Sequence, residues 1–173
     1  MKRIAFVLGA AVLGLSALTA CGGGGDDSAT APQSSTSQSD SGTGSGELKL
    51  ATADVGDFGK IVVDGTGRTL YVFDKDTASP SKSNCEGDCL AKWPAVAAGT
   101  GTPQLDGVDA SLVGTVTRSD GSKQVTLAGL PLYLFASDTK AGDAKGQAVG
   151  GVWWVVGADG KKITKQDSGN SGY

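Results

Sequence analysis

The sequence predicts a mostly β domain made of antiparallel hairpins in a meander, and three observations support this prediction. Short segments rich in Val, Ile, Thr and aromatic residues follow one another from residue 47 to residue 156. Asp-Gly dipeptides at positions 64, 120 and 159 separate several of these segments and favour tight hairpin turns. One eleven-residue stretch recurs 62 positions further along the chain, which predicts two related β units.

The predicted strands are short and end at turn residues. In chain order they are Glu47–Ala51, Lys60–Val63, Thr69–Phe73, Val113–Thr117, Gln124–Leu127, Leu130–Phe135 and Val152–Val156. Only residues 88–92, beside a cysteine, favour a short helical turn. Two related strands are apolar on both faces, because in each a pair of aliphatic side chains alternates with a tyrosine and a phenylalanine. We expect these two strands to be buried on both sides or to present one face to a ligand.

The internal repeat defines the domain organisation. Gly67–Thr77 aligns with Gly129–Thr139 and is identical to it at six of eleven positions. Each copy follows a β-rich segment and precedes a strand that contains tryptophan, at Trp93 in the first copy and at Trp153 in the second. The prediction is one domain of residues 47–165 with repeats at about 57–97 and 122–157, followed by a flexible tail of residues 166–173.

The repeat contains a spaced motif: tyrosine, any residue, an aromatic residue, any two residues, aspartate. Its two copies are Tyr71-Phe73-Asp76 and Tyr133-Phe135-Asp138. With this motif, a cysteine loop and a Trp-Pro pair, the chain resembles a bacterial family of secreted and lipoprotein repeats of unknown function, over roughly residues 57–157. The resemblance implies tandem repeats and a location outside the cytoplasm, and it implies no particular reaction. The second copy lacks the cysteine pair.

Residues 1–20 have the pattern of an export signal. Lys2 and Arg3 precede an uncharged, apolar stretch that is too short to span a bilayer comfortably. Leu18 to Cys21 resembles the bacterial lipobox, in which the cysteine is acylated and becomes the first residue of the mature protein. We expect lipid on Cys21 to anchor the chain to a bacterial cell membrane, on its extracytoplasmic face. The alternative is an ordinary secretory signal with a chance cysteine.

Residues 21–46 are predicted to be the lipidated cysteine and a disordered tether rich in Gly and Ser.

The two remaining cysteines are predicted to form a disulfide. With Cys21 assigned to lipid, Cys85 and Cys89 are an even pair in a compartment where disulfides persist. A redox dithiol or a metal clamp is less well supported, because three residues separate the cysteines and two thiols supply at most half of a structural zinc shell.

Composition excludes several classes of protein. The chain has no histidine, which excludes the Ser-His-Asp triad and the usual histidine ligand sets for zinc, copper and haem. Without Lys2 and Arg3 the chain keeps 13 basic residues against 18 acidic ones, so nucleic acid is not an expected partner. No cofactor or metal is expected. Residues 79–83 contain the serines and the lysine that a Ser–Lys pair needs, in a run that is more typical of a loop.

The motif side chains have two interpretations. In the structural one, the tyrosine and phenylalanine of each copy are core residues, and Asp76 and Asp138 accept hydrogen bonds from backbone amides of the following turn. In the functional one, the aromatic pairs and the tryptophans form a platform for a sugar, a peptide or an apolar molecule. A calcium site is a third hypothesis, although the spacing of its candidate ligands fits no EF-hand loop. Those candidates are Asp74, Asp76, Glu86 and Asp88.

The sequence therefore predicts a lipid-anchored, non-enzymatic binding or structural module of the cell envelope. Its expected partners are the bilayer and an envelope ligand such as a glycan, a peptide or a small molecule. The alternative is a histidine-independent hydrolase or a redox accessory protein.

Overall fold

The structure is a computed structural model that describes residues 47–165. The predicted signal, the lipidation site at Cys21, the tether and the tail lie outside the described residues. Strands dominate, as predicted, and the helix α1 lies at the predicted position. The elements are β1 Lys49–Asp54, η1 Gly56–Phe58, β2 Lys60–Asp64, β3 Tyr71–Phe73, β4 Thr77–Ala78, β5 Ser81–Lys82, α1 Asp88–Lys92, β6 Gln104–Asp106, η2 Ala110–Leu112, β7 Val113–Thr117, β8 Lys123–Leu127, β9 Leu130–Pro131, η3 Val149–Gly151 and β10 Trp153–Val155.

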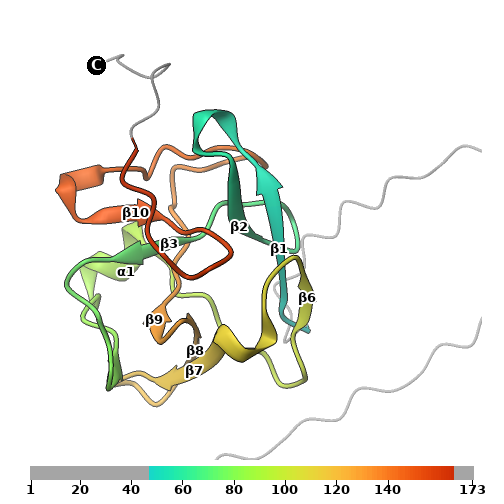
Figure 1. The fold of residues 1–173 in the computed structure, drawn as a ribbon. Helices are drawn as coiled ribbons and strands as arrows, with labels where there is room; N and C mark the ends of the chain where they lie inside the picture. Colours follow the sequence, from blue (N-terminus) through green and yellow to red (C-terminus); the bar gives the residue numbers. More distant parts are fainter. Residues whose placement is uncertain (1–46, 166–173) are drawn as a thin grey trace, which may run out of the picture. The chain divides into compact units, whose positions relative to one another are not determined.

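An antiparallel hairpin precedes the tyrosine segment of each repeat. In the first repeat β1 pairs with β2, and in the second β7 pairs with β8. The β7–β8 turn is closed by Asp120, whose carboxylate accepts hydrogen bonds from the backbone N–H and the hydroxyl group of Ser122. Figure 1 shows the first hairpin at the right of the domain and the second at the bottom, with β3 and β10 at the left.

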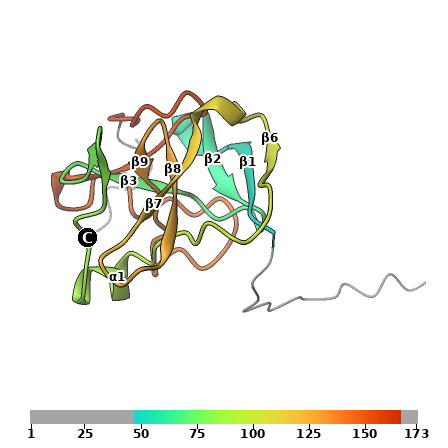
Figure 2. The same cartoon turned by 90° about the horizontal axis from the view of Figure 1, so that it is seen from below.

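One strand pairing differs from the predicted meander. The segment between the repeats returns to the first hairpin, where β6 pairs with β1 in parallel, with Leu105 opposite Leu50. Figure 2 shows β6 beside β1 at one edge of the domain. The pairing is parallel because the chain crosses the domain before it reaches β1, a connection that a hairpin turn does not make. Leu105 packs against buried aliphatic side chains there.

The two repeats interlock through their strands. β10, from the second repeat, pairs antiparallel with β3, from the first, and Trp153 lies opposite Phe73. In the related contact, Ala95 of the first repeat forms a bridge with Tyr133 of the second. Between these contacts Tyr71 and Tyr133 exchange two backbone N–H···O hydrogen bonds of 2.9 Å each. Each tryptophan segment therefore pairs with the tyrosine segment of the other repeat.

In the second repeat the predicted strand Leu130–Phe135 is a strand only at Leu130–Pro131 (β9), and Tyr133 forms isolated β-bridges. The alternation of side chains along β3 and along this second tyrosine segment still builds two hydrophobic clusters. Tyr71 and Phe73, with their second-repeat counterparts, both tryptophans 93 and 153 and several aliphatic residues, form one, here called the aromatic cluster. Leu70 and Val72 point the other way into an aliphatic cluster, together with Leu132. Both faces of β3 and of the second tyrosine segment are therefore buried, one of the two arrangements that the apolar alternation predicts.

We predict that neither repeat folds alone. Fragments 47–101 and 102–165 each lack the strand that pairs with their tyrosine segment, so each would leave backbone groups and aromatic side chains without partners. Circular dichroism should show disordered fragments separately and a cooperative, strand-rich unfolding transition when they are mixed in equal amounts. A fragment that unfolds cooperatively by itself would contradict the interlocked arrangement.

Candidate functional site

The tyrosine of each motif bonds to the aspartate of the other repeat. The hydroxyl group of Tyr71 donates to Asp138 Oδ2 at 2.6 Å. In the matching contact, the hydroxyl group of Tyr133 donates to Asp76 Oδ2 at 2.7 Å. Both tyrosines are fully buried, and both aspartates are less than a tenth exposed. The structure thus brings the four polar motif residues together as two crossed pairs.

The spacing of the motif follows from the turn after each tyrosine segment. The backbone N–H of Asp76 donates to the carbonyl oxygen of Phe73, three residues back, at 3.0 Å, and the second repeat has the same contact. This turn directs the carboxylate back into the domain. The other oxygen of Asp76 accepts from the backbone N–H of Asn84 at 2.7 Å, and that of Asp138 accepts from Lys145 N–H at 3.0 Å. Each carboxylate therefore receives a phenol and a backbone amide.

Burial changes the acidity of all four groups. It raises the pKa of both aspartate carboxyls, and the hydrogen bonds from the tyrosine and the backbone amide offset part of this rise. Burial also raises the pKa of Tyr71 and Tyr133 well above the ordinary value of a phenol, and the neighbouring carboxylates add to the effect. The phenols therefore stay protonated and donate to the carboxylates.

Four rings from the two repeats form a continuous stack. Trp93 and Trp153 lie face to face, with ring centroids 3.8 Å apart and an angle of 3° between planes. Phe73 stacks on the outer side of Trp153 at 4.1 Å, and Phe135 lies against Trp93 at 4.4 Å. The rings thus alternate between repeats. Tyr71 meets Trp93 edge-on, so the hydrogen-bonded pairs and the stack are in direct contact.

Gly146 allows the tyrosine and tryptophan rings to approach the backbone. A Cβ atom at this position would lie 2.7 Å from Cζ of Tyr71 and 2.9 Å from Cη2 of Trp93. The backbone N–H of Gly146 also donates to the hydroxyl oxygen of Tyr71 at 3.2 Å. Only glycine leaves room for this contact.

The first repeat supplies a different partner for Tyr133. Because the proton of Tyr133 goes to Asp76, the hydroxyl group of Ser83 donates to the tyrosine oxygen, at 2.6 Å. Ser83 in turn accepts from Arg118 Nη1 at 2.7 Å. Arg118 is only 7% exposed and also donates to Gln124 Oε1 and to the carbonyl oxygen of Cys85. The guanidinium group therefore ties the cysteine loop to the second hairpin.

The sequence did not indicate this role of Arg118. A lone arginine before an Asp-Gly turn has the pattern of a solvated hairpin end, and only its position opposite the cysteine loop reveals its partners. The disulfide between Cys85 and Cys89, which the sequence predicted, is present. Cys85 is fully buried in the aromatic cluster. The disulfide and Arg118 thus hold the same loop from two sides.

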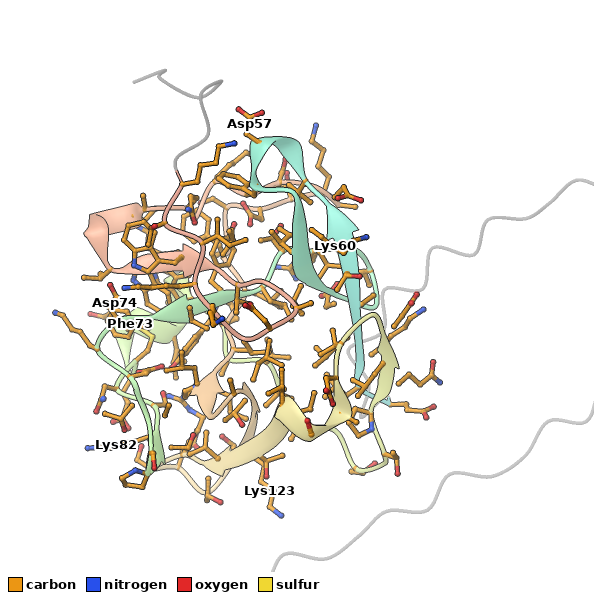
Figure 3. The ribbon with its side chains drawn as sticks, in the orientation of Figure 1. Asp57, Lys60, Phe73, Asp74, Lys82 and Lys123 are labelled. Carbon is orange, nitrogen blue, oxygen red and sulfur yellow. A yellow bond between two sulfur atoms is a disulfide. The ribbon has the colours of Figure 1, made fainter. Side chains whose placement is uncertain are left out.

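The candidate residues for a Ser–Lys pair and for a calcium site either bond to other protein groups or lie at the surface. Ser81 donates to the carbonyl oxygen of Gly129 at 2.6 Å, whereas Lys82 is exposed at the edge of the domain (Figure 3). Asp74 pairs with Lys162 at 2.6 Å and accepts from the indole N–H of Trp154 at 2.8 Å. In residues 47–165 no group of three or more acidic or cysteine side chains is arranged to hold a metal ion.

An open cleft borders the aromatic cluster. It has a volume of about 510 Å³, and its apolar lining residues are Val72, Phe73 and Leu130. Asp74 and Asp76 line it as well. The segment that follows β10 contributes Gly160, Lys161, Lys162 and Thr164. Figure 3 shows Phe73 and Asp74 next to each other at the end of β3. Phe73 is thus the member of the ring stack that lines the cleft.

The fold and the crossed motif define this domain as a tandem β repeat whose two copies complete each other. A family described as a secreted repeat of unknown function matches residues 52–97 and residues 114–157, just over half of the 173-residue chain. The chain belongs to this family. The two matches begin a few residues before the predicted repeats and end with them. The comparisons with curated proteins and with solved structures gave no match.

Membership in a family of secreted repeats supports a location outside the cytoplasm. Among residues 47–165 there is no helix with the length and hydrophobicity needed to cross a membrane.

We predict strong coupling between the tyrosine of one repeat and the aspartate of the other. Tyr71→Phe should lower the free energy of unfolding by about 1–3 kcal/mol, because it leaves a buried carboxylate short of one donor. In a double-mutant cycle with Asp138→Asn, denaturant titrations should give a coupling energy of about 1 kcal/mol or more.

The matched control pairs Tyr71→Phe with Asp76→Asn, the aspartate of its own repeat. These two changes should be nearly additive, because their side chains belong to different hydrogen-bonded pairs. Larger coupling within a repeat than between repeats would contradict the crossed arrangement.

Proposed function

We propose that this chain is a membrane-anchored extracytoplasmic lipoprotein whose domain is a non-enzymatic binding or structural module of the cell envelope. The observation that carries the proposal is the crossed pairing of the motif residues inside the core. A general base or a nucleophile has to reach its substrate. Tyrosines with no exposed surface whose hydroxyl groups bond to buried aspartates instead build the scaffold, which leaves recognition to the surface of the domain.

The same observation weighs against the motif as a ligand platform. Trp93 and Trp153 are 3% and 4% exposed, and their faces are covered by each other and by the phenylalanines. Trp154 is the tryptophan that is partly exposed. It lies beside Lys162, whose ammonium group is 5.4 Å from the centre of its ring. A ligand bound by this protein would therefore contact surfaces such as the cleft and the ring of Trp154, not the faces of the buried stack.

The proposal of a lipid anchor rests on the sequence around Cys21. Small residues precede this cysteine, a basic and apolar segment precedes those, and the following 25 residues have the composition of a tether. A chain of that length has an r.m.s. span of roughly 25–30 Å, enough to hold a domain clear of the headgroups. Two or more acyl chains on one cysteine would make the attachment stable.

We predict that Cys21→Ser abolishes lipid attachment. The variant should lose incorporation of labelled palmitate and should no longer sediment with membranes after a high-salt wash, because the thiol is the acylated group. The double variant Cys85→Ser/Cys89→Ser is the control and should keep both the label and the membrane association. Label that persists in Cys21→Ser would overturn the anchor.

We predict that a molecule bound by the domain is recovered unchanged. Residues 22–173 purified from an oxidising compartment should be examined by native mass spectrometry, first as isolated and then after incubation with soluble glycan and peptide fragments of the envelope. A binding module gives a mass shift whose added species is released intact, and a clean apo mass under both conditions favours a structural role. Cleaved fragments, formed in proportion to protein and time, would contradict the non-enzymatic assignment.

A further inference from the structure

The aromatic cluster contains features that packing alone does not require. Two stacked indoles lie at its centre, and each is met edge-on by a tyrosine, with centroid distances of 5.4 Å for Tyr71 and Trp93 and 5.1 Å for Tyr133 and Trp153. Each tyrosine hydroxyl group donates to a buried carboxylate. Phenylalanine and an apolar partner would fill the same space without taking two carboxylates out of water, which is costly.

This combination matches the needs of one-electron oxidation of a phenol. A phenol that loses an electron becomes a very strong acid, so the oxidation is easy only where a base stands ready to take the proton. Asp138 Oδ2 is 2.6 Å from the hydroxyl oxygen of Tyr71, and Asp76 Oδ2 is 2.7 Å from that of Tyr133, which is within the range for direct proton transfer. The raised pKa of each carboxyl makes it a better acceptor of that proton.

The stacked indoles connect the cleft electronically to the two tyrosines. The ring planes of Trp93 and Trp153 are nearly parallel and their centroids are 3.8 Å apart, so a positive charge on one is shared with the other. Phe73 continues the stack from Trp153 to the open cleft that it lines. A molecule in the cleft is thus one ring away from the indole pair, and the indole pair is in contact with both tyrosines.

We propose that this array is a site of reversible one-electron oxidation, with Tyr71–Asp138 and Tyr133–Asp76 as its proton-coupled donors. This activity goes beyond the proposed binding or structural role.

The step balances with an external one-electron oxidant, such as an oxidised metal complex or an organic radical. The oxidant gains one electron from the indole pair, which is refilled by one electron from Tyr71. The O–H bond of Tyr71 breaks and an O–H bond forms on Asp138, so the products are a neutral tyrosyl radical and a neutral carboxylic acid. An electron from a one-electron reductant and the return of the proton restore both groups. Tyr133 and Asp76 react in the same way.

The test uses the full chain in detergent, with Trp154→Phe and Tyr173→Phe introduced so that the aromatic cluster holds all remaining tryptophans and tyrosines. A photogenerated ruthenium(III) polypyridyl complex serves as the oxidant, and transient absorption and electron paramagnetic resonance detect the radicals. We expect a neutral tyrosyl radical whose rate of formation is independent of buffer concentration, because the proton goes to a carboxylate in the protein.

Asp76→Asn/Asp138→Asn removes both proton acceptors. In this variant we expect the tyrosyl yield to fall about tenfold or more, with the radical remaining on tryptophan. The matched control is Asp120→Asn, at an exposed hairpin turn, which should leave the yield unchanged. An unchanged tyrosyl yield in the double variant would overturn the proposal.

A second measurement covers the case in which the double variant does not fold. The rate of tyrosyl formation in the parent chain is compared with that of the same chain unfolded in urea, where the proton must go to buffer or water. Buffer-independent formation in the folded chain alone supports the proposal. Equal rates with equal buffer dependence in both states, or no radical in the folded chain, would overturn it.

Discussion

The domain depends on one constraint that acts between its repeats: each motif tyrosine finds its hydrogen-bond acceptor in the other copy. Tyr71 and Tyr133 also exchange backbone hydrogen bonds at the same point, so side chains and backbone are fixed together. A single repeat would leave a buried phenol and a buried carboxylate unpaired, at a cost of about 1–3 kcal/mol each. Domains of this size have only about 5–15 kcal/mol of net stability. Both copies are therefore needed together for folding.

The ring stack follows from the same crossing. Because each tryptophan segment pairs with the tyrosine segment of the other repeat, Trp93 and Trp153 arrive at the centre from opposite sides and meet face to face. The phenylalanines, two residues beyond the tyrosines on the same strand face, then cover the outer faces of the indoles. The tyrosine and the phenylalanine of the motif are thus two residues apart because the first makes the hydrogen bond and the second makes the stacking contact on the same side of the chain.

The sequence predicted the elements of the fold better than their partners. Alternating apolar residues indicated segments that are either buried on both faces or open to a ligand on one, and the structure shows the first arrangement; the even cysteine count indicated the disulfide. The crossed pairing was not predictable in this way, since the alternation of Tyr71 and Phe73 with aliphatic residues is the same whether a strand pairs within its repeat or across to the other. Periodicity shows which face of a segment is buried, but it does not show which other segment covers that face.

The site was predictable to a similar extent. The motif drew attention to Tyr71, Asp76, Tyr133 and Asp138 because two copies had the same spacing, and all four proved to lie together. Arg118 gave no such signal, because it occurs once, and the contacts it makes with Ser83 and Cys85 lie more than thirty residues away in sequence. Interactions that bring distant, unrepeated residues together leave no trace in a single sequence.

Departures from symmetry separate the roles of the two repeats. A fold of this kind needs only contacts that occur twice, and the motif supplies them. Features that occur once are not needed for the pairing of the repeats. One is the disulfide loop that Arg118 contacts. Another is Asp74 with its partners Lys162 and Trp154, because the second repeat has Ala136 in place of Asp74. Asp74 and Lys162 line the cleft that opens onto the ring stack. The repeated motif accordingly determines the architecture of this domain, and the residues that occur once around the cleft, such as Asp74 and Lys162, give its surface a character that the repeat alone does not supply.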